Sequence, residues 1–449
     1  MAVQYKDDKF VHLTSDIEKI RKRYRLYISY SNELAGLEVV KEILFNAIDE
    51  CKNPRSPANK IHIEFDERDG FITISDNGRG IPTDILEEVF TSLNMGSNID
   101  SSDKADLKVD VLGLNGVGTL AACGLAERVE ITSYRGGTEN KYKILVFEEG
   151  NKVDEKDGKC SPDKHGLSVK YKPSKIMGKN TRIVWESVHN ELIKEQYLLE
   201  QKINIDSLYI DKHGKEISEK YKIYPFQDIL NRNDKDSMIS PIYSLKISDN
   251  NLLEEFEDMA PIKRYITMDV AFAYTSSLTP YIDSFANSNN TVDNGDHLDG
   301  AIEAICRYFQ TATKNSMSDK EKEKLDIKWD DIRSGLSISI LLRTNFENLY
   351  TGQTKHKVVN DTIKKSIIEN LMKELGEYFG KNQARQKAVI DIVKMNARAR
   401  REGDKVRSAV IKTQMTNWSS FKMKNFDPCT AKGKEYRELF IIEGDKLTS

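Results

Sequence analysis

The chain has 449 residues, which at roughly 100–200 residues per domain predicts two to four domains and leaves ample length for hydrophobic cores. Hydrophobic residues make up 39% of the sequence and charged residues 31%, a balance that excludes a wholly disordered chain. The 68 basic and 71 acidic residues give a net charge of −3, so any contact with nucleic acid has to come from a local basic patch.

The first half of the chain predicts one long helix and several strands. Ser31 or Asn32 can cap a helix that continues through good helix formers to Cys51. Two short runs of alternating polarity, at 61–65 and 71–75, predict an antiparallel hairpin. Two further strands are predicted at 166–173 and 181–186.

The second half of the chain alternates polar runs with apolar ones. We expect the polar run at 284–300 to be a loop that leads into a helix, and the charged run at 314–331 to be an exposed loop. The apolar run at 335–346 has the length of a buried strand, and the run at 358–401 has the pattern of a long helical stretch. Two more strands are predicted at 265–274 and 438–445. The pattern as a whole predicts an α+β protein.

The cysteines and the apolar runs exclude two further classes of protein. The five cysteines are widely scattered without a C-x-x-C pair, which excludes a zinc ribbon or a disulfide framework and is typical of a reducing compartment. No apolar run approaches the ~20 residues that a membrane-spanning helix needs, and the start MAVQYKDDKF is not a signal peptide. We therefore expect an intracellular protein with no membrane partner.

One face of the first long helix carries the first candidate site. At 100° per residue, Glu42, Asn46 and Asp49 fall on one side of the helix. A carboxylate and an amide one turn apart can supply a general base for water and an oxygen ligand for Mg²⁺. A merely solvated polar face is the alternative interpretation. The opposite, apolar side is formed by Leu37, Val40, Leu44, Ile48 and Cys51.

The second candidate site follows the predicted hairpin. Asp76 ends an alternating strand and begins the run D-N-G-R-G-I-P. A carboxylate there can accept a hydrogen bond from an exocyclic amino group such as that of adenine. Gly78 and Gly80 let the backbone approach a ring closely or turn with positive φ. The alternative is a simple turn after a hairpin.

The third candidate site is the glycine-rich run from Gly113 to Gly118, which precedes a helix-like segment. Free backbone N–H groups at a helix start favour a bound phosphate. The run matches neither a P-loop nor the Rossmann G-x-G-x-x-G pattern. The polar segment at 95–111 is long enough to be a lid over a nucleotide. A flexible connector explains these glycines equally well.

Together these segments resemble the nucleotide motifs of the GHKL ATPases. The motifs are E-x-x-x-N-A-x-D-E at 42–50, D-x-G-x-G-I-P at 76–82 and G-x-x-G-V-G at 113–118. Other segments resemble the ATPase region of type IIA DNA topoisomerases, in the gyrase B, topoisomerase IV B or phage-type form. These are DIEKIRKRYRLYIS at 16–29, FANSNNTVDNGDHLDG at 285–300, the Q-T-K of 353–355, NARARR at 396–401 and ELFIIEGD at 438–445.

This resemblance implies a fold of three parts. Residues 1–225 would form a GHKL ATPase sandwich, with helices on a mixed β-sheet and an N-terminal arm that includes Tyr24, Tyr27 and Ile28. Residues 226–400 would form a transducer domain with a left-handed crossover β-α-β core and a long C-terminal helix. Residues 401–449 would form a linker and the start of a truncated Toprim domain.

The resemblance also implies roles for individual residues around ATP. Glu42 would be the general base and Asn46 the Mg²⁺ ligand, while Asp76 would hold the adenine amino group with support from Ser168. The base pocket would be lined by Arg79, which would pair with Glu50, and by Gly80, Ile81 and Pro82. The phosphates would be wrapped by Asn115, Gly116, Val117 and Gly118, with Lys108 contributing from the lid. From the second domain, Gln353 and Lys355 would reach the γ-phosphate. Glu443 would be the first Mg²⁺ ligand of the Toprim domain, whose acidic site is incomplete here.

The implied function is that of the ATP-driven N-gate of a type II topoisomerase. The chain would bind and hydrolyse ATP with Mg²⁺, form a homodimer on ATP binding and capture double-stranded DNA. As a fragment, it would depend for DNA cleavage on another subunit or on the C-terminal remainder of the enzyme. It would act in the bacterial cytoplasm and nucleoid or in a phage-infected cell. The alternatives are another GHKL ATPase, of the mismatch-repair or chaperone type, and a nucleotide-dependent dimerisation module.

A basic cluster near the end of the predicted long helix is the candidate DNA contact, since clustered lysines and arginines bind phosphates. A solvated helix end is the alternative interpretation. The cluster consists of Arg398, Arg400, Arg401, Lys405 and Arg407.

Overall fold

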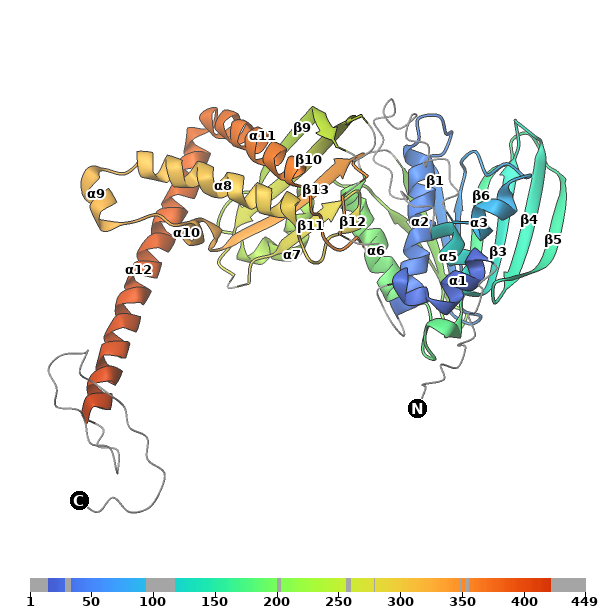
Figure 1. Ribbon diagram of the computed structural model, residues 1–449, viewed down its shortest axis with the longest axis horizontal. Helices are drawn as coiled ribbons and strands as arrows, with labels where there is room; N and C mark the ends of the chain where they lie inside the picture. Colours follow the sequence, from blue (N-terminus) through green and yellow to red (C-terminus); the bar gives the residue numbers. More distant parts are fainter. Residues whose placement is uncertain are drawn as a thin grey trace, which may run out of the picture.

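The structure is a computed structural model that describes residues 15–28, 34–93, 118–199, 203–255, 260–277, 279–347, 349–351 and 355–420. Within these residues the strands form two sheets, one of eight strands and one of five, and helices pack against both (Figure 1). The predicted α+β class is confirmed. Among the described helices, none combines the length and the apolar character needed to cross a membrane.

The first sheet contains β1 (Lys60–Asp66), β2 (Phe71–Asp76), β3 (Ala126–Arg135), β4 (Lys141–Glu148), β5 (Asn151–Lys159), β6 (His165–Pro173), β7 (Asn204–Ile210) and β8 (Glu216–Tyr221). The strand order is β5-β4-β3-β6-β2-β1-β7-β8. The sheet is mixed, because β1 pairs in parallel with β7 and antiparallel with β2. The alternate residues Ile61, Ile63 and Phe65 of β1 are buried, which is the pattern of a sheet with one face on the core.

Helices cover the buried face of this sheet. They are α1 (Asp16–Lys22), α2 (Ala35–Lys52), α3 (Leu86–Thr91), α5 (Gly118–Gly124) and α6 (Trp185–Leu198), with 3₁₀ turns at Tyr24–Leu26 and Lys175–Met177. Figure 1 shows α1, α2, α3 and α5 gathered on one side of the sheet. The helix α2 contacts β1, β2 and β6 as well as α5 and α6, so it is enclosed on several sides. This enclosure explains why Asp49, predicted to share an open polar face with Glu42 and Asn46, is buried instead.

The second sheet contains β9 (Tyr243–Glu254), β10 (Ile262–Tyr274), β11 (Ile282–Ala286), β12 (Asn289–Asn290) and β13 (Leu336–Thr344), in the order β12-β11-β13-β10-β9. Every residue of β13 is buried, as the apolar run predicts. The strands β11 and β13 pair in parallel. Because a parallel pair needs a crossover connection, the chain between them passes through a helix of 20 residues, α8 (Asp296–Asn315).

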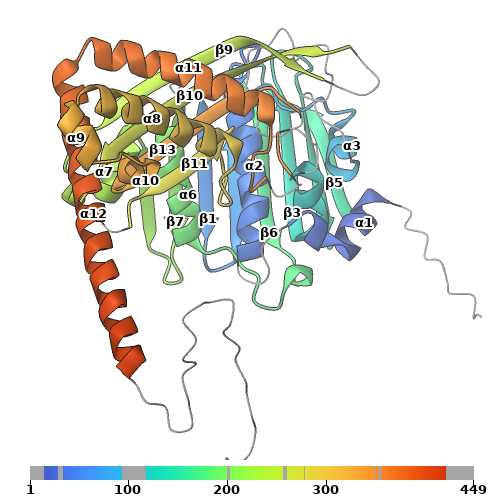
Figure 2. The ribbon, with the colours of Figure 1, turned by 60° about the vertical axis from the view of Figure 1, so that its left-hand side comes forward.

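The other helices of this half are α7 (Asp228–Asp234), α9 (Asp319–Lys324), α10 (Trp329–Arg333), α11 (Asp361–Gly380) and α12 (Gln383–Ser420), with a 3₁₀ turn at Lys235–Ser237. Figure 2 shows α8 and α11 side by side over the second sheet, and the two helices contact each other extensively. The helix α12 then leads away from the sheet, and residues 401–410 are exposed. Within α12, buried Val389, Val393 and Ala397 anchor its first half.

Several predicted elements are confirmed and others are wrong. The hairpin predicted at 61–65 and 71–75 is present as β1 and β2, paired from Ile61↔Asp76 to Asp66↔Phe71. The strand predicted at 181–186 is wrong, because α6 begins at Trp185 and buries Val188 and Leu192 with helical spacing. The predicted loops at 284–300 and 314–331 are also wrong in part. The first contains the ends of β11 and β12 and the start of α8, and the second contains α9 and most of α10. The segments around Ser31, Asn32 and 438–445 lie outside the described residues.

The helix α6 joins the two sheets physically. Its last residue, Leu198, is buried with Phe285 of β11 and Leu341 of β13 in one apolar cluster. The Leu198 carbonyl accepts a hydrogen bond at 3.3 Å from Nη2 of Arg343, whose Nη1 lies 2.5 Å from Oδ2 of Asp269. The end of α6 is therefore held by the second sheet, while its earlier residues pack in the core of the first.

The basic cluster of α12 is partly engaged within the molecule. The Arg400 guanidinium forms two hydrogen bonds with the buried Asp331 carboxylate, at 2.7 and 3.0 Å. Arg401 donates to the carbonyl of Lys324, and Lys405 lies 2.6 Å from Glu402. The described contacts therefore assign Arg400 mainly to holding α12 against the α9–α10 segment.

Charged residues line both edges of the first sheet. The edge strand β5 has the sequence NKVDEKDGK and is exposed over almost its whole length. The opposite edge strand, β8, has the sequence EISEKY, and only Tyr221 in it is buried.

Candidate active site

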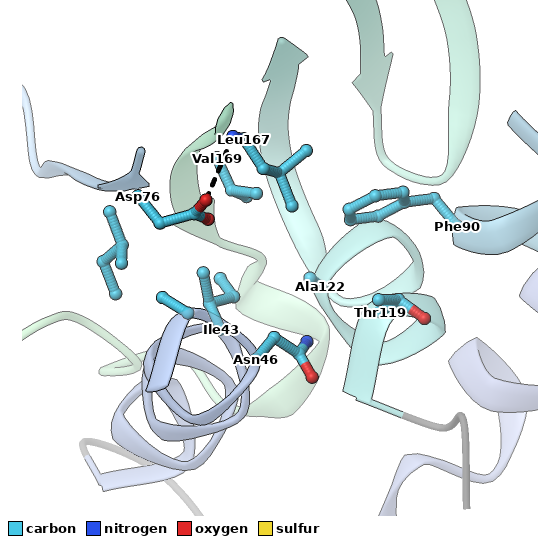
Figure 3. A pocket seen from close by; sticks show the side chains of 10 residues that line it. Ile43, Asn46, Asp76, Phe90, Thr119, Ala122, Leu167 and Val169 are labelled. Carbon is cyan, nitrogen blue, oxygen red and sulfur yellow. Dashed lines mark hydrogen bonds between the residues drawn. The ribbon is translucent and has the colours of Figure 1, made fainter. Parts of the chain in front are cut away.

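A small cavity lies between α2, the buried face of the first sheet and α5, and it collects residues from the predicted motifs (Figure 3). Asn46 reaches it from α2 and Asp76 from the end of β2, so two of the three predicted segments meet here. Most of the other lining residues are apolar, which suits a flat aromatic group held by a few polar atoms. The full lining is Ile43, Asn46, Ala47, Ile74, Asp76, Phe90, Thr119, Ala122, Leu167 and Val169.

The Asp76 carboxyl is the buried polar group of this cavity. Its Oδ1 accepts hydrogen bonds from the backbone N–H of Gly78 at 2.7 Å and of Leu167 at 3.4 Å. Burial raises the pKa of Asp76 to about 7, and the nearby charge of Glu50 acts in the same direction. Asp76 is therefore poised to change protonation near neutral pH.

A second carboxyl, Glu50, has the opposite behaviour. Its oxygens accept hydrogen bonds from the Arg79 backbone N–H and Nη2, both at 2.8 Å, and from Ser56 Oγ at 2.7 Å. Burial disfavours the charge, but these hydrogen bonds outweigh it and hold the pKa of Glu50 below its ordinary value. The predicted pairing of Arg79 with Glu50 is confirmed. It fixes the loop after Asp76 to helix α2.

The turn at Gly80 is specified by close backbone contacts. Gly80 has φ of +65°, and a Cβ there would lie 2.4 Å from the carbonyl oxygen of Tyr134. The buried Ser133 hydroxyl accepts from the Ile81 N–H at 2.9 Å and donates to the Ile81 carbonyl at 2.7 Å. Arg135 Nη1 donates to the carbonyl of Arg79 at 2.8 Å. Strand β3 therefore holds the loop that carries Arg79 to Pro82 in place.

The start of α5 touches the predicted general base. A Cβ built on Gly118 would lie 2.5 Å from Oε2 of Glu42, so the backbone of α5 approaches this carboxylate closely. Gly118 and Glu42 thus lie together, and Thr119 and Asn46 line the cavity next to them. The last residue of the third motif therefore lies against the helix that carries the first motif.

The prediction that Ser168 supports Asp76 is wrong by one residue. In β6 the side chains of Leu167 and Val169 line the cavity, and the Leu167 N–H contacts the Asp76 carboxylate. Successive side chains of a strand point to opposite faces, so Ser168 lies on the other face of the sheet. The support comes from a backbone amide instead of a hydroxyl.

Lys355 does not line this cavity. Its side chain is buried, and its φ of +57° is a left-handed conformation that non-glycine residues adopt rarely. The neighbouring chain is fixed by a hydrogen bond from the Asp293 N–H to the His356 carbonyl at 3.1 Å. The candidates Lys108, Asn115, Gly116, Val117, Gln353 and Glu443 lie outside the described residues.

The sequence reasoning missed most of the cavity lining and the residues that support the Gly80 turn. Phe90, Thr119 and Leu167 line the cavity from three separate elements. Ser133 and Arg135 lie on the same face of β3 and hold the Gly80 turn. The alternating pattern of 126–135 was a signal for this strand, but nothing in the sequence indicates which strand lies beside the turn.

Two family models match the chain. Residues 225–409 match the model of DNA gyrase B, and residues 32–148 match that of the histidine kinase-, DNA gyrase B- and HSP90-like ATPases. The DNA gyrase B protein of Spiroplasma citri is 29% identical over 447 residues, which cover 97% of this chain and 66% of that protein. The DNA topoisomerase IV B protein of Mycoplasma capricolum is 27% identical over 453 residues, with 98% and 66% covered. The chain thus spans about two thirds of the length of these relatives.

Solved structures show the same fold. The 43K ATPase domain of Thermus thermophilus gyrase B, in complex with an aminocoumarin, has a TM-score of 0.62 at 22% identity, covering 88% of this chain and 98% of that one. The ATPase region of Saccharomyces cerevisiae topoisomerase II has a TM-score of 0.58 at 19% identity, covering 85% and 99%. The predicted GHKL sandwich followed by a transducer domain is confirmed as the fold.

Proposed function

We propose that this chain is the ATPase region of a type IIA DNA topoisomerase, and that it binds ATP in the cavity between α2 and α5 and hydrolyses it to drive a DNA gate. The observation that carries this proposal is the meeting of three motifs. Asp76 and Asn46 line one cavity, and Gly118 lies against Glu42 beside it.

The adenine base would lie against Asp76. An ionised carboxylate accepts a hydrogen bond from an amino group, and the apolar side chains of Ile43, Ile74 and Val169 would contact the ring. The loop from Arg79 to Pro82 would form the rim of the pocket. Its pairing with Glu50 and Ser133 means that it is ordered before the nucleotide arrives.

The donors present suit Mg²⁺. Asn46 offers an amide oxygen in the cavity, and the described residues contain no cluster of three or more metal-binding side chains. Mg²⁺ fits such a site because it keeps several waters and takes its other ligands from substrate phosphates. When bound, it would neutralise charge that develops on the phosphates. Glu42 would accept the proton of the attacking water, as general bases do.

The phosphates would be bound by both halves of the chain. Asn115, Gly116, Val117 and Gly118 would supply backbone N–H groups, and Lys108 a cation from the lid. Gln353 and Lys355 would add contacts from the second domain. The strained backbone of Lys355 supports this role, because rare conformations cluster at ligand-binding positions. Such a contact depends on the third phosphate, so ATP and ADP would favour different domain angles.

The wider activity follows from the family. We infer an ATPase domain at 1–225, a transducer domain at 226–400 and the start of a Toprim domain at 401–449, in which Glu443 would bind Mg²⁺. The first sheet ends at Tyr221 and the second begins at Tyr243, which supports this division. ATP would drive homodimerisation, and the dimer would capture double-stranded DNA, with cleavage left to a partner subunit or a C-terminal remainder. The protein would act in a bacterial cytoplasm or a phage-infected cell.

The direct test is a complex with a non-hydrolysable ATP analogue and Mg²⁺, studied by crystallography together with light scattering. We expect adenine at Asp76, phosphates at Gly118 and a mass that doubles on addition of the analogue. An empty cavity at saturating analogue would refute the proposal. A nucleotide-dependent dimer without ATP turnover would favour the dimerisation module instead.

A further inference from the structure

A glutamate occupies an apolar position in the helix that joins the two domains. On α6, Val188, Leu192 and Glu195 are spaced by four and three residues, so all three lie on one buried stripe. Each is at most 1% exposed. Such a position is normally filled by leucine or valine, because burying a charge without a partner is costly. Glu195 is therefore a local exception to the pattern that folds the helix.

Neither carboxyl oxygen of Glu195 has a hydrogen-bond partner in the described part of the chain. The groups that act on it electrostatically are Glu191 and Lys194 of α6 and Lys41 and Lys52 of α2. Burial raises the pKa of Glu195 to about 7, far above its ordinary value, so the carboxyl keeps its proton in this arrangement up to neutral pH.

The neighbouring Glu191, one helical turn earlier, forms ion pairs with two lysines. Its Oε1 lies 2.5 Å from Nζ of Lys194 and 3.4 Å from Nζ of Lys41. The pKa of Glu191 is lowered in spite of its burial, chiefly by these two lysines. Two of the three lysines that act on Glu195, Lys41 and Lys194, thus form their ion pairs with Glu191 instead.

The cluster connects the nucleotide helix with the second domain. Lys41 precedes Glu42 on α2. Lys194 lies 5.9 Å from the ring centre of Phe285 on β11, and its charge also acts on Asp283 of that strand. The end of α6 is fixed to the second sheet through Leu198 and Arg343. A rotation of the second domain would therefore move α6 against α2 at this cluster.

We propose that Glu195 is a second acceptor for Lys41, and that Lys41 passes from Glu191 to Glu195 when ATP changes the angle between the domains. Glu191 and Glu195 are four residues apart on one helix, so their side chains are neighbours, and the flexible stem of lysine can reach either. In the step, the Glu195 carboxyl releases its proton to water and pairs with the Lys41 ammonium, while Lys194 stays on Glu191. Glu195 is then a positioning residue for the ATPase. This inference rests on the proposed function.

The first experiment needs no nucleotide. Urea unfolding of the protein and of Glu195→Gln is measured at pH 5, 6, 7 and 8. A carboxyl whose folded pKa lies above its unfolded pKa stabilises the fold less as pH rises from about 4.5 to 7. We expect Glu195→Gln to show a flatter fall of stability over this range, and the control Glu186→Gln, on the exposed side of α6, to behave like the parent. Identical slopes in all three proteins would overturn the proposal.

The second experiment follows the proton. Binding of a non-hydrolysable ATP analogue and of ADP is measured by calorimetry at pH 7, in two buffers of different ionisation enthalpy. We expect the ATP analogue, but not ADP, to release more protons from the parent than from Glu195→Gln. We also expect Glu195→Gln to lower kcat by about tenfold while KM changes little, a coupling of ordinary size. Equal proton release and equal kcat would overturn the proposal.

The two experiments separate this inference from the proposed function. A protein that binds no adenine nucleotide would refute the function, whereas the pH dependence of unfolding still decides the state of Glu195. A variant Glu195→Leu adds an independent check. It should be more stable than the parent at pH 8 and slower in turnover, because a leucine fills the apolar position but cannot accept Lys41. A Glu195→Leu protein with normal kcat would contradict the proposal.

Discussion

The guanidinium of Arg79 spans both carboxylate oxygens of Glu50, with Nε 3.0 Å from Oε1 and Nη2 2.8 Å from Oε2. The cation next to the cavity, Arg79, is therefore paired with Glu50. Asp76 is left with backbone amides as its hydrogen-bond donors in the described chain, and its pKa rises where that of Glu50 falls. Two neighbouring carboxyls therefore have separate roles, one structural and one open to a ligand.

The first prediction concerns the pH dependence of nucleotide binding. Burial raises the pKa of Asp76 to about 7, so the carboxylate that we propose as the acceptor of the adenine amino group is present above pH 7 and is lost below it. We expect the affinity for ADP to fall as pH drops from 8 to 6, measured by calorimetry. Asp76→Asn should remove this dependence and weaken binding by roughly 1.5–3 kcal/mol, the usual contribution of a hydrogen bond to a charged group. The control Asp66→Asn changes a half-buried carboxyl outside the cavity, with a pKa of about 2, and should leave the profile intact. A parent protein with constant affinity from pH 6 to 8 would contradict the role of Asp76.

The second prediction concerns Glu42. If it is the general base, Glu42→Gln should lower ATP turnover by about 10²–10⁴-fold, while nucleotide binding persists. Glu88→Gln, at an exposed position of α3, is the matched control and should keep the parent rate. Steady-state phosphate release measures both. Equal rates in the parent and Glu42→Gln would remove Glu42 from its assigned role.

The third prediction concerns Lys355. Removal of a preorganised contact to the transferred phosphate typically costs about 2.7–4 kcal/mol in the transition state. Lys355→Ala should therefore reduce kcat by about 10²–10³-fold and spare the affinity for ADP. Lys357→Ala removes an exposed lysine two residues away and serves as the control. Loss of ADP binding with unchanged kcat would argue against a contact that depends on the third phosphate.

The fourth prediction concerns the support of the Gly80 turn. The Ser133 hydroxyl makes two hydrogen bonds to the backbone of Ile81 and is fully buried. Ser133→Ala leaves two partly buried backbone groups of Ile81 without this partner, and an unsatisfied buried group costs about 1–3 kcal/mol. We expect a lower urea midpoint and weaker nucleotide binding. The control Ser161→Ala, at an exposed position, should change neither. A Ser133→Ala protein as stable as the parent would show that β3 does not hold the turn.

The fifth prediction separates structural from DNA-binding arginines on α12. Arg400→Ala leaves the buried Asp331 carboxylate without its bidentate partner and should cost roughly 1.5–3 kcal/mol of stability. Arg407 is exposed, so Arg407→Ala should stay within about ±0.5 kcal/mol of the parent. If the cluster contacts DNA, Arg407→Ala should weaken binding to a DNA duplex and reduce its salt dependence. The reverse pattern, with Arg407 needed for stability, would refute this division.

The sequence predicts the nucleotide motifs better than the elements between them. Glu42 and Asn46 lie on α2 and Asp76 lies at the end of β2, as expected, because helical periodicity and a strand end are local properties of the chain. The error at Ser168 arose because a shift of one residue in a strand moves every side chain to the other face. The strand expected at 181–186 turned out to be irregular chain followed by α6, because Val188 and Leu192 pack against distant parts of the first domain. The partnership of Ser133 with Ile81 depends on sheet order, which local pattern does not encode.

The charged edge strands of the first sheet affect how copies of the protein associate at high concentration. A strand such as β5 exposes unpaired backbone groups that invite another chain to extend the sheet. Lysines and acidic residues along β5 and β8 make such edge-to-edge pairing between two copies of the chain unfavourable. These edge charges therefore disfavour association through the sheet edges, which would compete with the ATP-driven homodimer that we propose.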